Sequence, residues 1–171
     1  MVDEPCAVMA PFDEERVEAE ASFEAFFRQH HVRLFGTLCL VSGDRGEAEE
    51  LMQEAFLRIW ERWQRVSAHP DPVGYLYRTA FNLERDRGRR LRRAAGRMTG
   101  ASSSTDAFDR VDERTDVLDA LRKLSPRQRA AVVLTDLLGL DSSEAGRMLG
   151  VRAVTVRSLA SQARSALRPA L

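Results

Sequence analysis

Arginine side chains form two dense groups along the sequence, and both groups are suited to binding phosphate. Residues 85–97, RDRGRRLRRAAGR, contain seven arginines and one aspartate, and residues 145–171 contain five arginines and no acidic residue. The whole chain is formally neutral, and acidic side chains are concentrated in residues 1–24 and 103–119. Two cationic segments separated by an acidic one favour a protein with two surfaces for a polyanion such as nucleic acid.

The second arginine group lies on a sequence that predicts a helix-turn-helix, SSEAGRMLGVRAVTVRSLASQARSAL. Asp141 and Glu144 have the spacing of a capping box at the start of the first helix. Gly150 ends that helix, because glycine adopts the left-handed turn conformation without steric cost. Gly146 supplies a small residue where the two helices touch, and Val156 supplies an aliphatic side chain inside the second helix. This is the spacing expected of a helix pair that reads DNA.

The second of these helices, from about residue 153 to 167, is expected to have a buried and an outward face. The buried face is formed by Val156, by either Leu159 or Ala160, and by Ala163. The outward face carries Arg152, Thr155, Arg157, Ser158, Ser161 and Arg164. Arginine reads guanine edges in the major groove, while hydroxyl and guanidinium groups hold phosphates, so this face predicts binding to double-stranded DNA. A pair of structural helices with a basic surface is the alternative.

A long amphipathic helix is predicted over residues 43–66, GDRGEAEELMQEAFLRIWERWQRV. Asp44 and Glu47 again have the spacing of a capping box. One buried stripe follows the three- and four-residue spacing of a helix: Ala48, Leu51, Met52, Ala55, Phe56, Ile59, Trp60 and Trp63. Glutamates crowd the start of this segment and arginines crowd its end, which complements the helix dipole.

Further helices are predicted on both sides of this one. Residues 21–43 form either a helix pair or one long helix, and residues 67–74, SAHPDPVG, form a loop because two prolines and a glycine interrupt the pattern. Residues 75–95 return to a helix whose inward side chains are expected to be Leu76, Ala80, Leu83 and Leu91. Downstream, Ser125 and Pro126 are placed as the N-cap and first position of another helix.

These patterns predict an all-α fold, with two small helical domains joined by a flexible linker and the helix-turn-helix in the C-terminal domain. The linker is placed at residues 98–114, because MTGASSSTDAF is small, polar and glycine-containing. An acidic N-terminal extension is expected at residues 1–21. The first domain is then expected at residues 22–97, and the second at residues 115–171.

The order of these parts resembles the extracytoplasmic-function (ECF) sigma factors, the two-domain promoter-recognition subunits of bacterial RNA polymerase. The resemblance covers about residues 22–97 and 115–168. AEELMQEAFLRIWER resembles the polymerase-binding helix of the family, and GYLYRTAFNLERDRGRR the segment that melts and reads the downstream promoter element. LRKLSPRQRAAVVLTDLLGLDSSEAGRMLGV resembles the promoter-binding C-terminal domain. The implied function is binding of core RNA polymerase, followed by promoter recognition, melting and transcription initiation.

The resemblance also implies roles for individual residues. By this resemblance, the residues that contact the clamp helices of the polymerase β′ subunit are Glu50, Gln53, Glu54 and Leu57. Asn82 matches an asparagine near the pocket for a flipped base of the melted strand, with residues 67–73 as the rim of that pocket. The residues that bind the phosphates of the downstream element are Arg78, Arg85, Arg87, Arg89 and Arg90. The upstream element is double-stranded and is bound by the outward face of the second helix of the helix-turn-helix. An anti-sigma factor is a further candidate partner.

Several positions depart from the pattern of the family. Tyr75 stands where tryptophan is usual, and Phe81 where a basic residue is common. In the C-terminal domain Val154 replaces a glycine, and Leu159 with Ala160 replaces an arginine–leucine pair. These changes affect residues expected to melt or read DNA, so the resemblance implies no particular promoter sequence.

Other classes of function fit the sequence less well. An enzyme is not indicated, because His30, His31 and His69 form no metal-ligand pattern and no phosphate loop or nucleophile elbow occurs. A helix-turn-helix repressor that acts without polymerase is the main alternative, but it leaves the AEELMQEAFLRIW segment without a purpose. A purely helical interaction protein would use the arginines only as a solubilising surface.

No metal or cofactor is expected, because Cys6 and Cys39 are far apart and form no C-x-x-C motif. Cysteine usage of this kind favours the reducing cytoplasm. No window approaches 18 unbroken apolar residues, so insertion into a membrane is not expected. The acidic start of the chain also lacks the positive segment of a secretory signal.

Overall fold

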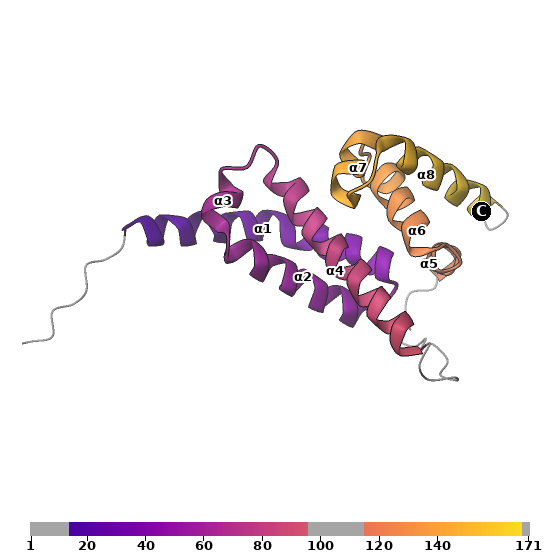
Figure 1. Cartoon of the computed structure of the whole chain (residues 1–171), viewed down its shortest axis with the longest axis horizontal. Coiled ribbons are helices and arrows are strands. Elements are labelled where there is room, and N and C mark those ends of the chain that lie inside the picture. Colours follow the sequence, from indigo (N-terminus) through magenta and orange to yellow (C-terminus); the bar gives the residue numbers. More distant parts are fainter. Residues whose placement is uncertain (1–13, 96–114, 169–171) are drawn as a thin grey trace, which may run out of the picture.

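The computed structural model describes residues 14–95 and 115–168, and within these ranges every regular element is helical (Figure 1). The N-terminal half comprises α1 (Glu14–Ser42), α2 (Arg45–Trp60), α3 (Trp63–Ser67) and α4 (Pro72–Ala95). The C-terminal half comprises α5 (Thr115–Arg122), α6 (Pro126–Val132), the π-helical turn η1 (Val133–Leu137), α7 (Ser142–Leu149) and α8 (Ala153–Leu167). The all-α prediction is confirmed.

The first helix is longer than the sequence pattern indicated. α1 is one continuous helix that begins at Glu14 and ends at Ser42, so it crosses the boundary expected at residue 22. The predicted linker and most of the predicted extension lie outside the described residues. The four domain bounds therefore stay a prediction.

Caps set the start of several helices. The predicted box at the start of α7 is complete, and α6 has a complete box as well, with Pro126 at its first position. At α2 only half of the predicted box forms. The Asp44 carboxylate accepts a hydrogen bond from the backbone N–H of Glu47 at 2.6 Å. The Glu47 carboxylate does not return to the cap but lies 3.4 Å from Nε of Arg87 on α4.

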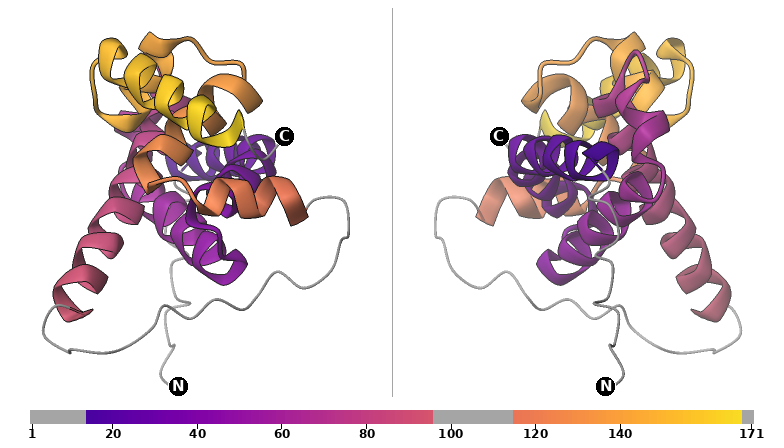
Figure 2. Two further views of the ribbon diagram at one scale, coloured as in Figure 1. Left: turned by 90° about the vertical axis from the view of Figure 1, so that its right-hand side faces the viewer. Right: turned by 90° about the vertical axis from the view of Figure 1, so that its left-hand side faces the viewer.

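Two expectations about α4 were wrong. Pro72 and Gly74 belong to its first turn, where proline is tolerated because its missing N–H is not needed there. Asp71 caps that turn by accepting the N–H of Gly74 at 2.8 Å. Leu91 is 59% exposed rather than inward. The reason is visible in Figure 2, where the C-terminal end of α4 projects away from the other described helices.

The two halves pack against each other and share one apolar core. α4 contacts α7, and α1 contacts both α6 and η1. One continuous cluster of buried side chains joins Leu34 and Leu38 of α1 to Ala131 of α6, Leu134 of η1 and Val156 of α8. α7 and α8 lie on one side of α1, and α2 lies on the other (Figure 1; Figure 2). Burial of this apolar surface is the main force that holds the halves together.

Candidate functional site

The four residues predicted to bind polymerase form one exposed surface on α2, here called the α2 face: Glu50, Gln53, Glu54 and Leu57. They point outward because the opposite stripe of the helix, which includes Leu51, Phe56 and Ile59, is buried. Leu57 is 56% exposed, which is unusual for a large aliphatic side chain on a well-packed helix. The α2 face therefore combines two carboxylates and an amide with one apolar side chain.

Aromatic side chains from α1 support the end of α2. The ring of Phe23 lies 4.9 Å from the ring of Trp60 and 5.4 Å from that of Trp63, measured between centroids. Phe27 lies 4.8 Å from Phe56 in the same way. Trp60 was predicted to be buried but is 36% exposed. It is the last residue of α2, and its ring packs against Phe23 of α1. Sequence reasoning gave Phe23 and Phe27 no role, although their four-residue spacing is a signal for one helix face.

An ion pair joins the α2 face to α4, and the sequence gave no sign of it. Nη1 of Arg87 donates to Oε2 of Glu50 at 2.5 Å, and Nε of Arg87 lies 3.4 Å from the Glu47 carboxylate. The hydrogen bond to Glu50 raises the pKa of the Arg87 guanidinium. Burial raises the pKa of Glu47, an effect that Arg87 opposes. One predicted phosphate ligand is thus held by a residue predicted to bind polymerase.

A cavity of about 330 Å³ lies where the end of α2 meets α4. It is lined by Arg58, Glu61, Arg62, Tyr75, Arg78, Thr79 and Asn82. None of the expected rim residues 67–73 is among them, because Tyr75, Arg78, Thr79 and Asn82 of α4 form that wall instead. Oδ1 of Asn82 accepts a hydrogen bond from Nη2 of Arg85 at 2.9 Å, so its amide nitrogen is the group left for a ligand.

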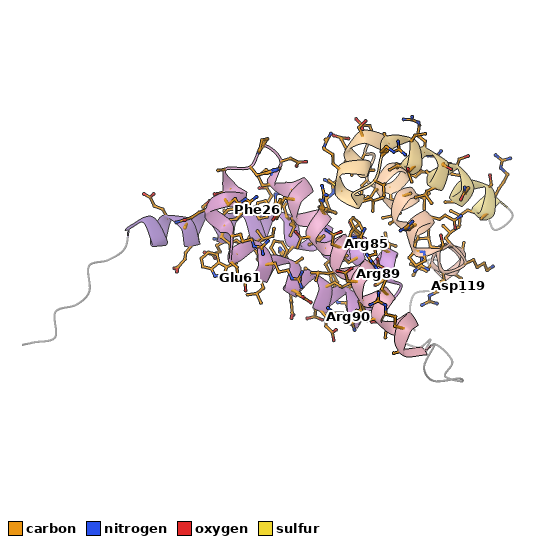
Figure 3. The ribbon with its side chains drawn as sticks, viewed as in Figure 1. Phe26, Glu61, Arg85, Arg89, Arg90 and Asp119 are labelled. Carbon is orange, nitrogen blue, oxygen red and sulfur yellow. The ribbon has the colours of Figure 1, made fainter. Side chains whose placement is uncertain are left out.

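The other predicted phosphate ligands follow one another along α4. Figure 3 shows Arg85, Arg89 and Arg90 along this helix. Arg78, Arg89 and Arg90 are exposed, whereas Arg85 is half-buried and its Nε has no hydrogen-bond partner. Arg89 also lies 3.3 Å from Asp86 on the same helix. Of the departures noted above, Phe81 is buried, and Tyr75 lines the cavity beside Asn82.

The helix-turn-helix has the geometry that the sequence predicted. Gly150 has a φ of +66°, the left-handed conformation that lets α7 end in a tight turn. A Cβ added to Gly146 would lie 2.8 Å from the carbonyl oxygen of Val151, closer than real Cβ atoms approach. Only glycine therefore fits where α7 meets the turn. Val156 is fully buried and anchors α8 against α7.

The outward face of α8, here called the reading face, is largely open. Arg152, Arg157, Ser158, Ser161 and Arg164 are exposed, and Thr155 is half-buried. Ala160 and Ala163 are buried as expected, and Leu159 is half-buried beside them. Val154, which replaces a glycine of the family pattern, is 56% exposed and so adds an apolar group to this surface.

Arg164 is not free within the reading face. Its Nε and Nη2 donate to the two carboxylate oxygens of Asp136 in η1 at 2.8 and 2.7 Å. These bonds lower the pKa of Asp136 and raise that of Arg164. A bidentate pair of this kind fixes the guanidinium in one orientation. Sequence reasoning missed Asp136, because the two residues are far apart in the chain.

Within the described residues, no helix is long and apolar enough to cross a membrane, and no group of three acidic, histidine or cysteine side chains could hold a metal ion.

Comparison with known proteins identifies both halves of the chain. Residues 26–106 match the family model described as sigma-70 region 2, and residues 114–167 match sigma-70 region 4. The ECF RNA polymerase sigma factor SigE of Mycolicibacterium smegmatis is 35% identical, over 97% of this chain and 68% of that protein. The RNA polymerase sigma-E factor of Streptomyces coelicolor is 28% identical, over 87% of this chain and 85% of that protein.

A solved structure shows the same fold. The sigma factor RpoE of Bartonella quintana, in complex with the anti-sigma factor NepR, superposes with a TM-score of 0.67 at 22% identity. The superposition covers 87% of this chain and 96% of that one. The helical halves and their order therefore define a sigma-70 type protein with regions 2 and 4.

The chain belongs to the ECF sigma factors. It is thus an RNA polymerase-binding protein that recognises promoters, and a repressor acting without polymerase is not favoured. Sigma factors are generally not enzymes.

Proposed function

We propose that the α2 face is the surface that docks on core RNA polymerase, at the clamp helices of the β′ subunit. Its carboxylates Glu50 and Glu54 are exposed and suited to pairing with arginines of a partner. Leu57 supplies the apolar centre that a stable contact needs. Trp60 and Phe23 pack against each other and hold the end of α2 in place, so little conformational entropy is lost on binding.

We propose that α4 holds the melted strand of the downstream promoter element. The cavity around Asn82 offers an amide N–H, a tyrosine ring and several arginines, a combination that binds an unstacked base and its backbone. The exposed arginines Arg78, Arg89 and Arg90 continue this surface along the helix and are suited to phosphates. Arg85 supports the site from below by orienting Asn82.

We propose that the reading face of α8 enters the major groove of the upstream element. Arg152 is the N-cap of α8, and Thr155 and Arg157 lie in its first two turns, the part of a recognition helix that reaches base edges. Ser158 and Ser161 continue the face and are suited to phosphate contacts. Arg164 reaches DNA only if its pair with Asp136 opens.

The observation that carries this proposal is the division of charge among three exposed surfaces. The α2 face is acidic, while the arginines of α4 and the reading face of α8 are basic, and the reading face contains no acid. One surface is therefore suited to a cationic protein partner and two to nucleic acid. We infer a cytoplasmic protein without catalytic activity, in keeping with this role. An anti-sigma factor is a proposed partner, by analogy with the Bartonella protein.

Transcription in vitro tests this function directly. The purified chain is added to bacterial core RNA polymerase and a genomic promoter library, and transcripts are mapped. We expect initiation at a defined set of promoters and no transcripts without the chain. A gel-shift assay with the same promoters separates the repressor alternative, because a repressor would bind duplex DNA tightly without polymerase. Failure to bind polymerase or to direct initiation would end the proposal.

A further inference from the structure

We propose that Glu61, at the end of α2, selects the base that enters the cavity around Asn82, and that it favours a base with an exocyclic amino group over thymine. Adenine, cytosine and guanine each carry such a group, and thymine does not. The proposal rests on the role proposed above for α4, which is to hold the melted strand. It adds which bases that strand must present.

Glu61 is an acid in a cavity that is otherwise basic. Among the described residues that line this cavity it is the one acid, whereas Arg58, Arg62 and Arg78 are cations. The Glu61 carboxylate has no hydrogen bond or ion pair within the described part of the chain, and Arg58 is held instead by Glu54 at 2.6 Å. An acid here repels the phosphates of a bound strand. Its carboxylate is nevertheless available to accept hydrogen bonds from a base.

The backbone that carries Glu61 is fixed by packing. Its N–H donates to the carbonyl oxygen of Leu57 at 3.0 Å, which continues the hydrogen-bond pattern of α2. Trp60 and Trp63, on either side of it in the sequence, pack on the ring of Phe23 with centroids 4.9 and 5.4 Å away. Figure 3 shows Glu61 at this end of α2. A site for specific recognition is more precise on a helix anchored in this way than on a loop.

The other polar groups of the cavity divide into donors and acceptors. Oδ1 of Asn82 is occupied by Arg85, so the Asn82 amide offers N–H donors. The Thr79 hydroxyl donates to the carbonyl oxygen of Tyr75 at 2.9 Å, so it can only accept from a ligand. The Tyr75 ring, which contacts His69 at a centroid distance of 5.7 Å, supplies a surface for stacking. A base in this cavity therefore meets both donors and acceptors.

This set of groups matches three of the four bases. Adenine and cytosine each have an amino group beside a ring nitrogen that accepts, and guanine has two N–H groups beside a carbonyl oxygen. Each of these bases can donate to Glu61 and accept from Asn82 at the same time. Thymine has one ring N–H between two carbonyl oxygens, and these oxygens are repelled by a carboxylate. The volume of about 330 Å³ has room for a purine or a pyrimidine.

Two simpler roles for Glu61 predict different behaviour. A carboxylate that only lies in water near the strand repels phosphates, so its removal would tighten binding to all four bases by the same factor. A carboxylate that contacts polymerase would, when removed, lower the affinity for core enzyme. Selection of the base predicts instead that only the preference at one position of the strand changes.

The test uses the full chain assembled with core RNA polymerase, on promoter DNA whose downstream element is held open as a bubble. The unpaired strand has a random sequence, and sequencing of the bound fraction gives the base preference at each position. With the parent chain we expect one or more amino-bearing bases to be favoured over thymine by about tenfold at one position. In Glu61→Gln this ratio should fall to about twofold there, because glutamine also offers an N–H that thymine accepts.

Glu24→Gln is the matched control. It removes the same charge from an exposed side chain of α1 that pairs with Arg28 and lines no part of the cavity. The base preference of this variant should equal that of the parent. The affinity of each chain for core enzyme is measured in parallel and should be the same for all three.

The outcomes separate the role of Glu61 from the strand-binding role of α4. A parent without a preference against thymine, or a preference that survives unchanged in Glu61→Gln, would overturn selection by Glu61 and leave strand binding intact. Equal tightening for all four bases, or weaker capture of core enzyme by Glu61→Gln, would overturn it too. If the assembled protein binds the bubble no better than duplex DNA, and Asn82→Ala changes nothing, strand binding by α4 fails and selection by Glu61 fails with it.

Discussion

Asp136 pairs with Arg164, one of the arginines of the reading face, and this contact bears on the DNA-binding role proposed for that face. Its carboxylate holds Arg164 through two hydrogen bonds and also accepts one from the Thr135 hydroxyl at 2.7 Å. An acid beside a phosphate-binding surface repels DNA, and here it also occupies an arginine of that surface. If the reading face binds DNA as proposed, Asp136 limits the contribution of Arg164 to DNA affinity.

Replacing Asp136 with asparagine should tighten duplex binding by a few fold. The slope of log K against log salt concentration should steepen by about one, because Arg164 can then neutralise one more phosphate. Folding stability at neutral pH should fall by no more than about 1 kcal/mol, because Arg164 is exposed and surface ion pairs are weak. Fluorescence anisotropy over a salt series measures both quantities. Asp119→Asn is the control, since its partner Arg122 lies on α5, outside the helix-turn-helix. Weaker binding by Asp136→Asn would show that the pair positions Arg164 for DNA.

Acid should destabilise the C-terminal half through Asp136 and Asp141. Hydrogen bonds from Arg164 lower the pKa of Asp136, and the backbone N–H groups of Glu144 and Ser143 lower that of Asp141. A depressed folded-state pKa stabilises the protein above the unfolded value, near 3.9, and this contribution is lost as the pH falls through the folded value. Thermal unfolding should therefore shift to lower temperature below about pH 4. Asp136→Asn should show a smaller shift over that range, and an identical shift would contradict the assignment.

At the scale of elements, the turn between α7 and α8 has a strict steric requirement set by backbone atoms. Gly146 lies against the backbone after α7, and Gly150 supplies the left-handed residue that reverses the chain. The complete capping box at Asp141 fixes the start of α7. α8 is held by Val156 and Ala160, both nearly fully buried. The reading face keeps its direction only if this packing is maintained.

Gly146→Ala should destabilise the protein by about 1–3 kcal/mol, because its Cβ would meet the Val151 carbonyl oxygen and the backbone must shift. Gly36→Ala is the matched control, since Gly36 lies in α1 with nothing within 4 Å of an added Cβ. That substitution should stabilise by about 0.5–1 kcal/mol through helix propensity. Urea unfolding measures both. Equal effects at the two glycines would contradict the close approach of α7 to its turn.

At the scale of the molecule, the α2 face and the DNA surfaces lie on connected elements. Arg87 on α4 pairs with Glu50 on α2, so the proposed polymerase surface and the arginines of α4 share an ion pair. A partner that pairs with Glu50 would free Arg87 from this contact, which makes it available for its proposed role at a phosphate. The packing of α4 on α7 then connects this pair to the helix-turn-helix. If the proposed roles of the two surfaces hold, α4 is the element that connects them.

Reversing charge on the α2 face should abolish capture of core polymerase. In Glu50→Lys with Glu54→Lys we expect affinity to fall by at least about tenfold, because two cations would face the arginines of the partner. Helical content should remain, since both side chains are exposed. Glu24→Lys on α1 is the control, an exposed acid away from α2. Pull-down with core enzyme measures the effect, and retained capture would rule out the α2 face as the docking surface.

Local patterns in the sequence predict most of the helices and the faces that they expose. The helix-turn-helix, its glycines, the outward residues of α8 and the exposed α2 face all follow from interactions within about four residues, which a sequence pattern records directly. The start of α4 was missed because proline was taken as a loop signal, although it is tolerated in a first turn. Leu91 was expected to be buried but is exposed, because the periodicity of a helix does not show where the helix extends beyond the helices packed against it.

The tertiary structure alone decided which of these side chains meet. Glu50 and Arg87 are 37 positions apart, Asp136 and Arg164 are 28 apart, and Val41 and Arg129 are 88 apart. Such pairs depend on the angles and offsets at which helices pack, and many arrangements of side chains satisfy the same apolar pattern. The contacts between the two halves therefore depend on the packing of the whole chain, whereas each exposed surface follows from the local sequence.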